Sequence, residues 1–183
     1  MVIKLGSLFD GIGGFPLAAS CYGVEPVWAS EIEPWPIKVT EKHFPNMKHL
    51  GDITQINGAE IEPVDVVTFG SPCQDLSVAG KREGLAGARS GLFMEAVRII
   101  REMRTATDGQ YPRFAVWENV PGAFSSNKGQ DFRAVLEEIA EAEIPMPASG
   151  KWATAGMVRT ERIAVSYTHL TLPTNYSVSI SVV

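Results

Sequence analysis

The chain has 183 residues, 45% of them hydrophobic and 20% charged, which suffices for one globular domain with a substantial core. Its formal net charge of -5 and isoelectric point near 5.2 argue against a generally basic protein that coats nucleic acid, although they leave a local basic face open. Its two cysteines, Cys21 and Cys73, are too few for a disulfide framework, and no CxxC or His/Cys cluster suggests zinc.

Short runs of β-forming residues alternate with helical patterns along most of the chain. We predict strands over residues 2–9, 25–30, 49–53, 64–69 and 114–117. Helices are predicted from residue 15 to the stop signal at Gly23, and over residues 35–43, 92–104 and 132–140. Asp131 is expected to cap the last helix. Cys21 is expected to lie within the first helix and to be buried in the core. Alternating strands and helices indicate βαβ units and a mostly parallel sheet, so the predicted fold class is α/β.

The C-terminal segment differs from the rest of the chain. Residues 166–183 contain no acidic or basic side chain, show no helical period and are rich in Ser and Thr. We expect residues 1–165 to form the domain and residues 166–183 to be a tail that is disordered or artefactual.

No membrane or targeting segment is expected. No apolar run reaches the roughly 18 residues that a membrane-spanning helix needs. The start of the chain carries Asp10 and no small-residue cleavage site, which argues against a signal peptide. We therefore expect a cytoplasmic protein.

A glycine-rich turn, FDGIGG at residues 9–14, separates the first predicted strand from the first helix. Glycines let a ligand approach the backbone closely, and a helix N-terminus offers free N–H groups. Glu31 lies 20 positions after Gly11, at the end of the next strand, where a carboxylate can bind ribose hydroxyls. Pro16 replaces the third glycine of the dinucleotide pattern, so S-adenosylmethionine fits better than a dinucleotide. A purely structural turn explains these glycines about equally well.

Two further stretches follow predicted central strands. SPCQ at residues 71–74 places Cys73 among polar neighbours at the sheet edge where α/β proteins bind ligands, with basic residues downstream that favour a thiolate. ENV at residues 118–120 brings Glu118 to the same edge, and a thiolate beside a carboxyl proton donor suits covalent catalysis. Taken singly, Cys73 could be a bystander thiol and Glu118 a helix cap or a solvated acid.

Together these stretches resemble the cytosine-C5 DNA methyltransferase family. The order FDGIGGF, an acidic residue after the second strand, GDI, GSPCQDLSVAG, RSGLF and ENV matches that family over residues 1 to about 165. The resemblance implies a Rossmann-like S-adenosylmethionine-dependent methyltransferase fold, a mostly parallel sheet with flanking helices. It also implies an incomplete C-terminus, because the family pattern continues into a segment that reads DNA.

The resemblance also implies roles for individual residues. Phe9, Gly11 and Gly13 would form the floor of the S-adenosylmethionine pocket, and Glu31 would bind the ribose hydroxyls. Asp52 would accept from the adenine amino group, with Ile53 beside the ring. Further cofactor-binding positions would be Asp10, Gly14, Ile32, Gly70 and Pro72.

The implied catalytic positions are Cys73, which would attack C6 of a flipped cytosine, and Glu118, which would bind N3 and the exocyclic amine. Asn119 would hold its loop, Pro72 would shape the cysteine loop, and Gln74 would accompany Cys73. The implied partner is double-stranded DNA, with a cognate restriction endonuclease in the same system. We expect a monomer that binds no metal.

Two other functions remain open on the sequence. An NAD-dependent or redox enzyme could use a reactive cysteine, although Pro16 and the absence of a second nearby cysteine argue against it. An inactive remnant or cofactor-binding module would keep these residues without turnover. Cofactor binding without DNA methylation would favour the second of these alternatives.

Overall fold

The computed structural model describes residues 2–71, 91–119, 121–160, 163–171 and 176–182. Its contacts divide the chain into two units, which are described separately. The first unit comprises residues 1–70 and 98–116, and the second comprises residues 71–97 and 117–183. No helix in the described ranges has the length and apolar character needed to cross a membrane.

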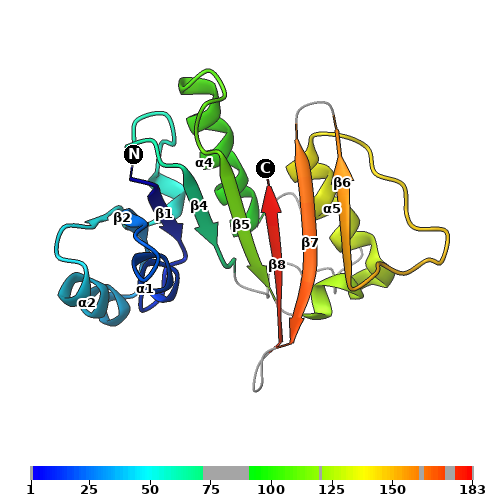
Figure 1. Ribbon diagram of the computed structural model, residues 1–183, viewed down its shortest axis with the longest axis horizontal. Helices are drawn as coiled ribbons and strands as arrows, with labels where there is room; N and C mark the ends of the chain where they lie inside the picture. The colour runs from blue at the N-terminus through cyan, green and yellow to red at the C-terminus, as the bar shows by residue number, and fades with distance from the viewer. Residues whose placement is uncertain (1, 72–90, 120, 161–162, 172–175, 183) are drawn as a thin grey trace. The chain divides into compact units, whose positions relative to one another are not determined.

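The first unit contains a parallel sheet (Figure 1). Its strands are β1 (Lys4–Leu8), β2 (Glu25–Ser30), β3 (Lys48–His49) and β4 (Val66–Phe69), in the order β3-β2-β1-β4. The first residues of β5 (Phe114–Asn119) continue this order, and the Phe114 N–H donates to Asp65 O at 3.0 Å. The predicted parallel sheet is confirmed.

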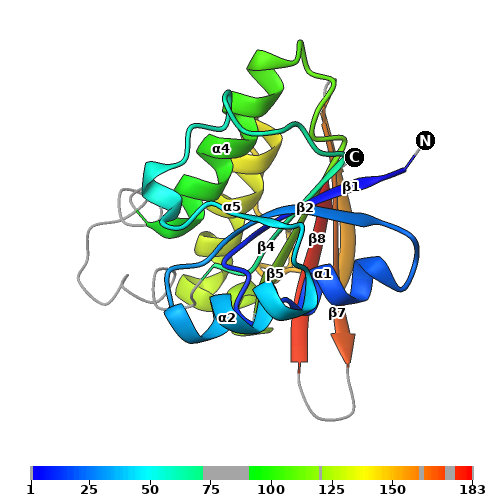
Figure 2. The same ribbon diagram turned by 90° about the vertical axis from the view of Figure 1, so that its left-hand side faces the viewer.

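Two helices connect the first three strands. They are α1 (Gly14–Ser20) and α2 (Pro34–His43), which lie together on the same side of the first unit in Figures 1 and 2. The C-terminal part of α4 (Leu92–Ala106) also belongs to this unit. Buried apolar residues of β1, β2 and β4 form its core, among them Leu8, Trp28 and Phe69.

The second unit combines a helix with an antiparallel sheet. Its elements are the 3-10 helices η3 (Pro121–Phe124) and η4 (Ser126–Gly129), helix α5 (Gln130–Ala140), and strands β6 (Ala155–Arg159), β7 (Ala164–Thr171) and β8 (Tyr176–Val182). The strand order runs β5-β8-β7-β6, and both β6–β7 and β7–β8 pair antiparallel. Edge-to-face contacts among Phe132, Trp152 and Tyr167 fill the core between α5 and the sheet.

Strands β7 and β8 run through the segment that the sequence separates from the domain. Val165 pairs with Val182 and Thr168 with Ser179 in the backbone ladder. The boundary between a domain of residues 1–165 and a tail of residues 166–183 stays a prediction.

Three local expectations are corrected. The predicted strand over residues 49–53 is a two-residue strand, because Gly51 turns the chain with φ +72° and Asp52 then caps the 3-10 helix η1 (Ile53–Gln55). Asp131 is not the N-cap of α5, since Gly129 occupies that place and buried Asp131 accepts from Ser126 Oγ instead. Cys21 is exposed, because α1 ends at Ser20 and Cys21 is its C-cap.

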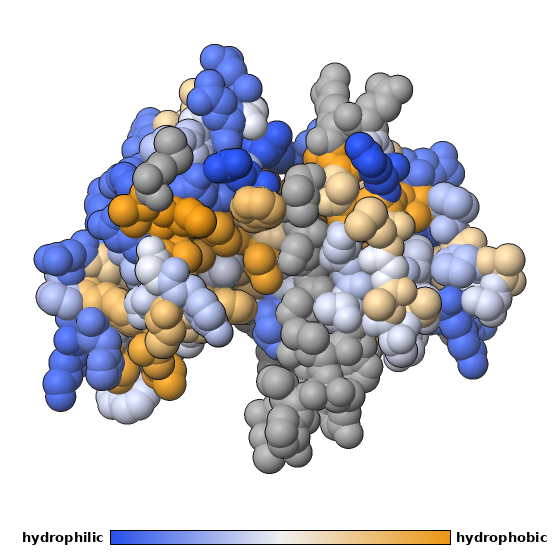
Figure 3. Space-filling model, in the orientation of Figure 1, coloured by the Kyte–Doolittle hydropathy of each residue, from blue (hydrophilic) through white to orange (hydrophobic). Residues whose placement is uncertain are grey.

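Several large apolar side chains of the first unit are exposed. Ile12 in the turn after β1, Leu17 in α1, Ile32 after β2 and Trp35 in α2 are 59%, 58%, 65% and 67% exposed. Figure 3 shows hydrophobic surface interspersed with hydrophilic surface on the visible face of this unit.

Candidate functional site

The predicted cofactor residues meet at one edge of the first unit's sheet. The turn at residues 9–14 follows β1, Glu31 and Ile32 follow β2, Asp52 and Ile53 follow β3, and Gly70 follows β4. These four strands are parallel neighbours, so all of these residues lie at the carboxyl edge where open α/β sheets bind ligands. Ser30 Oγ donates to Gly51 O at 2.7 Å, which joins the segments that follow β2 and β3.

The turn after β1 has a left-handed backbone at three positions. Gly11 has φ +56° and Gly13 has φ +85°, where glycine is the residue without strain. Phe9 adopts φ +56°, which an aromatic side chain rarely does and which is typical of functional sites. A Cβ at Gly13 would lie 2.8 Å from Thr40 Cγ2, whereas a Cβ at Gly11 or Gly14 would meet no described atom within 4 Å. Packing therefore explains Gly13, and the space beside Gly11 and Gly14 would admit a ligand.

Glu31 is held in place by three backbone N–H groups. Its Oε2 accepts from Gly11 N at 2.8 Å, and its Oε1 accepts from Ile32 N at 2.8 Å and Glu33 N at 3.0 Å. The bond to Gly11 links the end of β2 to the glycine-rich turn after β1. A carboxylate fixed in this way keeps lone pairs for further donors, such as a pair of hydroxyls.

Asp10 is a buried carboxylate in the same turn. It is 6% exposed, and neither of its oxygens has a hydrogen-bond partner among the described residues. Burial raises the pKa of Asp10, and the Glu31 charge adds to the rise. A buried carboxylate without a partner is costly, so this position is suited to accept a donor or a cation from a ligand.

Replacing Asp10 by asparagine is expected to stabilise the ligand-free chain at pH 7 by about 1 kcal/mol. Because the folded-state pKa of Asp10 is raised, the folded chain binds its proton more tightly than the unfolded chain does. Ionisation of Asp10 therefore costs stability as the pH rises through the unfolded-state pKa toward the raised one. Urea unfolding of both chains between pH 4 and pH 7 measures the difference, which should grow with pH; a difference that is largest at pH 4 would contradict this assignment.

Asp52 and Ile53 begin the segment after β3. Asp52 Oδ1 accepts from Thr54 N at 2.9 Å, which fixes the carboxylate at the start of η1. Ile53 is 4% exposed and belongs to the core of the first unit. Ile32, beside Glu31, is the more exposed apolar residue of this edge at 65%.

The predicted catalytic residues belong to the second unit. Pro72, Cys73 and Gln74 lie outside the described residues. The residue before them, Ser71, is 4% exposed, and its Oγ accepts from Trp117 Nε1 at 3.2 Å. This bond fixes the beginning of the cysteine segment against β5.

Glu118 and Asn119 are the last two residues of β5, so both lie within the strand and not after it. Burial raises the pKa of Glu118, which extends the pH range over which its carboxyl group is protonated. Asn119 is 2% exposed. Among the described residues, no group of three or more His, Cys, Asp or Glu side chains could hold a metal ion.

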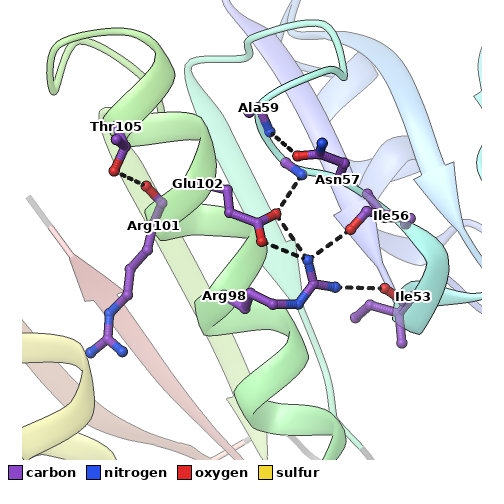
Figure 4. Close-up of polar contacts among 9 residues, drawn as sticks. Ile53, Ile56, Asn57, Ala59, Arg98, Arg101, Glu102 and Thr105 are labelled. Carbon is purple, nitrogen blue, oxygen red and sulfur yellow. Dashed lines mark hydrogen bonds and ion pairs between the residues drawn. The ribbon is translucent and has the colours of Figure 1, made fainter.

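Sequence reasoning did not identify Arg98 and Glu102 of α4 as part of this edge. Arg98 donates to Ile53 O and Ile56 O, and Glu102 accepts from Gly58 N (Figure 4). The available signal was the Arg98–Glu102 spacing of four residues, which predicts an ion pair on one helix face but gives no hint of the loop beneath it.

The sequence profile of the family described as C-5 cytosine-specific DNA methylase matches residues 3–143. Type II methyltransferase M.HhaI of Haemophilus parahaemolyticus is 35% identical over 141 residues, which cover 77% of this chain and 41% of that protein. Type II methyltransferase M1.ScrFI of Lactococcus lactis subsp. cremoris is 36% identical over 141 residues, which cover 76% of this chain and 34% of that protein. A DNA N-6-adenine-methyltransferase of Escherichia phage P1 is 35% identical over 157 residues, which cover 80% of this chain and 21% of that protein.

Solved methyltransferase structures share the fold. A putative DNA modification methyltransferase encoded within an Escherichia coli prophage superposes with a TM-score of 0.65 at 19% identity, covering 99% of this chain and 46% of that one. The Entamoeba histolytica methyltransferase EhMeth gives a TM-score of 0.67 at 13% identity, covering 100% of this chain and 53% of that one. The Rossmann-like methyltransferase fold is therefore confirmed. The chain spans less than half the length of the three sequence relatives named above.

Proposed function

Because this chain belongs to the C-5 cytosine-specific DNA methylase family, we propose that it transfers a methyl group from S-adenosylmethionine to C5 of cytosine in DNA. The observation that carries the proposal is the Glu31 carboxylate, held by the Gly11, Ile32 and Glu33 N–H groups at the carboxyl edge of the sheet. This arrangement suits the paired hydroxyls of a ribose.

The neighbouring residues also fit S-adenosylmethionine. The open space beside Gly11 and Gly14 would admit the ligand close to the backbone. Asp10, buried and without a described partner, would accept from the cationic methionine part. Asp52 would accept from the adenine amino group, with Ile53 and the exposed Ile32 beside the ring. Phe9, Gly13, Gly70 and Pro72 complete the proposed set.

Cytosine C5 is a poor nucleophile within an aromatic ring, and the proposed catalytic residues address this. The Cys73 thiolate forms a bond to C6 while Glu118 gives a proton to N3, so the ring loses its aromaticity and C5 becomes enamine-like. Bound S-adenosylmethionine supplies an electrophilic methyl group for C5. Removal of the C5 proton by a base then restores the C5–C6 double bond and expels the thiolate, while N3 returns its proton to the Glu118 carboxylate.

Glu118 suits the role of proton donor, because burial raises its pKa. Asn119 would hold the end of β5, while Pro72 and Gln74 would shape the segment around Cys73. The target base must leave the helical stack to reach these groups, at a cost of a few kcal/mol.

Methylation of adenine at N6 is a second candidate, because the relative from phage P1 is named for that reaction. The N6 amino nitrogen attacks a methyl group itself, so this chemistry requires no thiolate adduct. The SPCQ segment favours the cytosine reaction. An inactive cofactor-binding remnant is the third candidate, and binding of S-adenosylmethionine without methylation of DNA would identify it.

The proposed setting is a bacterial or phage cytoplasm, with double-stranded DNA as the substrate. Several relatives are named as type II methyltransferases, so a cognate restriction endonuclease is a proposed partner. We expect the chain to act as a monomer, and residues 166–183 to lie outside its functional part.

Replacing Cys73 by serine is expected to abolish covalent capture of DNA that contains 5-fluorocytosine. Fluorine at C5 cannot leave as a proton does, so the adduct persists as a band resistant to denaturant on a gel. The chain is joined for this test to the C-terminal region of the Haemophilus relative, because it spans 41% of that protein.

The matched control is Cys21→Ser, which changes the exposed C-cap of α1 and should leave the captured fraction unchanged. Capture by the Cys73→Ser protein at the parent level would refute the nucleophile assignment. Methylated adenine in place of methylated cytosine in the product DNA would select the second candidate.

A further inference from the structure

We propose that Arg98 and Glu102 of α4 are positioning residues for the adenine loop, residues 52–58, and thereby set the preference of the site for an adenine base. This role rests on the proposed function. Arg98 Nη1 donates to Ile56 O at 2.8 Å, and Arg98 Nη2 donates to Ile53 O at 3.2 Å (Figure 4). One planar guanidinium thus holds both ends of η1, since Ile53 is its first residue and Ile56 its C-cap.

Glu102 completes the arrangement from the next turn of the helix. Both of its oxygens lie 2.9 Å from Arg98 Nη1, and Oε2 also accepts from Gly58 N at 2.7 Å. The carboxylate therefore orients the guanidinium and holds a third point of the adenine loop. The side chains of Arg98 and Glu102 are 33% and 32% exposed, so solvent screens these bonds only in part.

The loop is also pressed against the backbone of α4. A Cβ at Gly58 would lie 2.3 Å from Ile99 O. Only glycine at position 58 therefore lets the loop approach the helix this closely. Two apolar side chains of the loop, Ile53 and Ile56, are buried in the core of the first unit. Polar and apolar contacts therefore fix the loop on the same helix.

The consequence for binding follows from Asp52, which is the N-cap of η1. A shift of η1 carries the Asp52 carboxylate with it, and a hydrogen bond weakens steeply once its heavy atoms separate beyond about 3.5 Å. Loss of the Arg98 contacts should therefore weaken recognition of the adenine amino group more than it weakens contacts elsewhere on the ligand.

The test uses this 183-residue chain and two ligands, S-adenosyl-L-homocysteine and S-inosyl-L-homocysteine. They differ at position 6 of the purine, where an amino group that donates is replaced by a carbonyl that accepts. Calorimetric titration gives the ratio of their dissociation constants. We expect Arg98→Met to reduce the preference for the adenosyl ligand by roughly tenfold, the size of one lost hydrogen bond. The ligand preference of Arg98→Lys should lie between those of the parent chain and Arg98→Met, because one ammonium group cannot bind both carbonyl groups in the geometry of the guanidinium.

Arg133→Met is the matched control. Arg133, which is 28% exposed, forms an i,i+4 ion pair with Glu137 on α5 at 2.9 Å. Glu137 in turn accepts from Ile144 N at 3.0 Å. The control thus removes a similar ion pair that also fixes a loop, but in the second unit. Its ligand preference should equal that of the parent chain.

Hydrogen exchange supplies a readout that needs no ligand. The amides of Thr54 and Gly58 should exchange faster in Arg98→Met and at the parent rate in Arg133→Met. Unchanged exchange together with an unchanged preference would overturn the proposal. Equal weakening of both ligands would also overturn it, because Arg98 would then support stability alone. A parent chain that binds neither ligand would refute the proposed cofactor site and with it the adenine preference, even if the exchange data show that Arg98 holds the loop.

Discussion

Replacing Glu31 by alanine is expected to weaken binding of S-adenosylmethionine by about 1.5–3 kcal/mol, or roughly ten- to 150-fold in the dissociation constant. The loss has two sources. The ribose would lose a charged acceptor, and the Gly11, Ile32 and Glu33 N–H groups would lose their shared partner, so the turn after β1 would no longer be tied to the end of β2.

Glu31→Gln separates these two sources. Glutamine keeps the length of the side chain but places an NH₂ group where one oxygen now accepts a backbone N–H, so part of the network must rearrange. We expect an intermediate loss of affinity. Glu41→Ala removes an exposed carboxylate from α2 and serves as the control for net charge. A titration in which Glu31→Ala binds as the parent chain does would refute the ribose role.

The sequence pattern predicted the elements whose signals are local. Strand β2 has the bounds that its run of apolar residues predicts, and α2 differs by one residue. Both are delimited by residues that start or stop elements by their own chemistry, such as Pro34 at the beginning of α2. The parallel order of the sheet follows from the alternation of strands and helices.

The misplaced elements depend on turns and side-chain contacts that the strand and helix patterns do not describe. The strand predicted over residues 49–53 fails because Gly51 and Asp52 redirect the chain into η1, which Arg98 then holds from a helix 45 residues away in sequence. Aspartate is a favoured N-cap residue, but Asp131 lies in the first turn of α5, where Ser126 and Asn127 of η4 donate to its carboxylate. The side chain of Asp131 is thus held by the neighbouring segment η4, and Gly129 takes the N-cap position in its place.

The residues of the candidate site likewise include some that the sequence predicted and some that it did not. Glu31 and the glycines could be selected from spacing alone, because strand ends in a parallel sheet must lie at one edge. The left-handed backbone of Phe9 and the burial of Asp10 could not be read from composition, since both depend on the folded geometry of the turn. The geometry around Cys73 lies outside the described residues, so its role stays a prediction.

Replacing Gly6 by alanine is expected to destabilise the chain by about 3 kcal/mol or more, the upper range for overpacking a core. Gly6 of β1 pairs with Trp28 of β2, and a Cβ at Gly6 would lie 2.1–2.4 Å from three atoms of the indole ring. The ring cannot move aside easily, because Trp28 is 1% exposed and its Nε1 donates to Glu62 O at 2.9 Å. The midpoint of urea unfolding measures the loss.

Gly14→Ala is the matched control, because a Cβ there would meet no described atom within 4 Å and Gly14 is the first residue of α1. Its unfolding midpoint should be unchanged or slightly higher, since alanine favours the helix. If the indole ring is the cause of the loss, Gly6→Ala should cost much less in a Trp28→Leu background than in the parent chain, which a double-mutant cycle detects. Equal costs in both backgrounds would instead assign the loss to the backbone of β1, whose register shifts between Leu5 and Gly6.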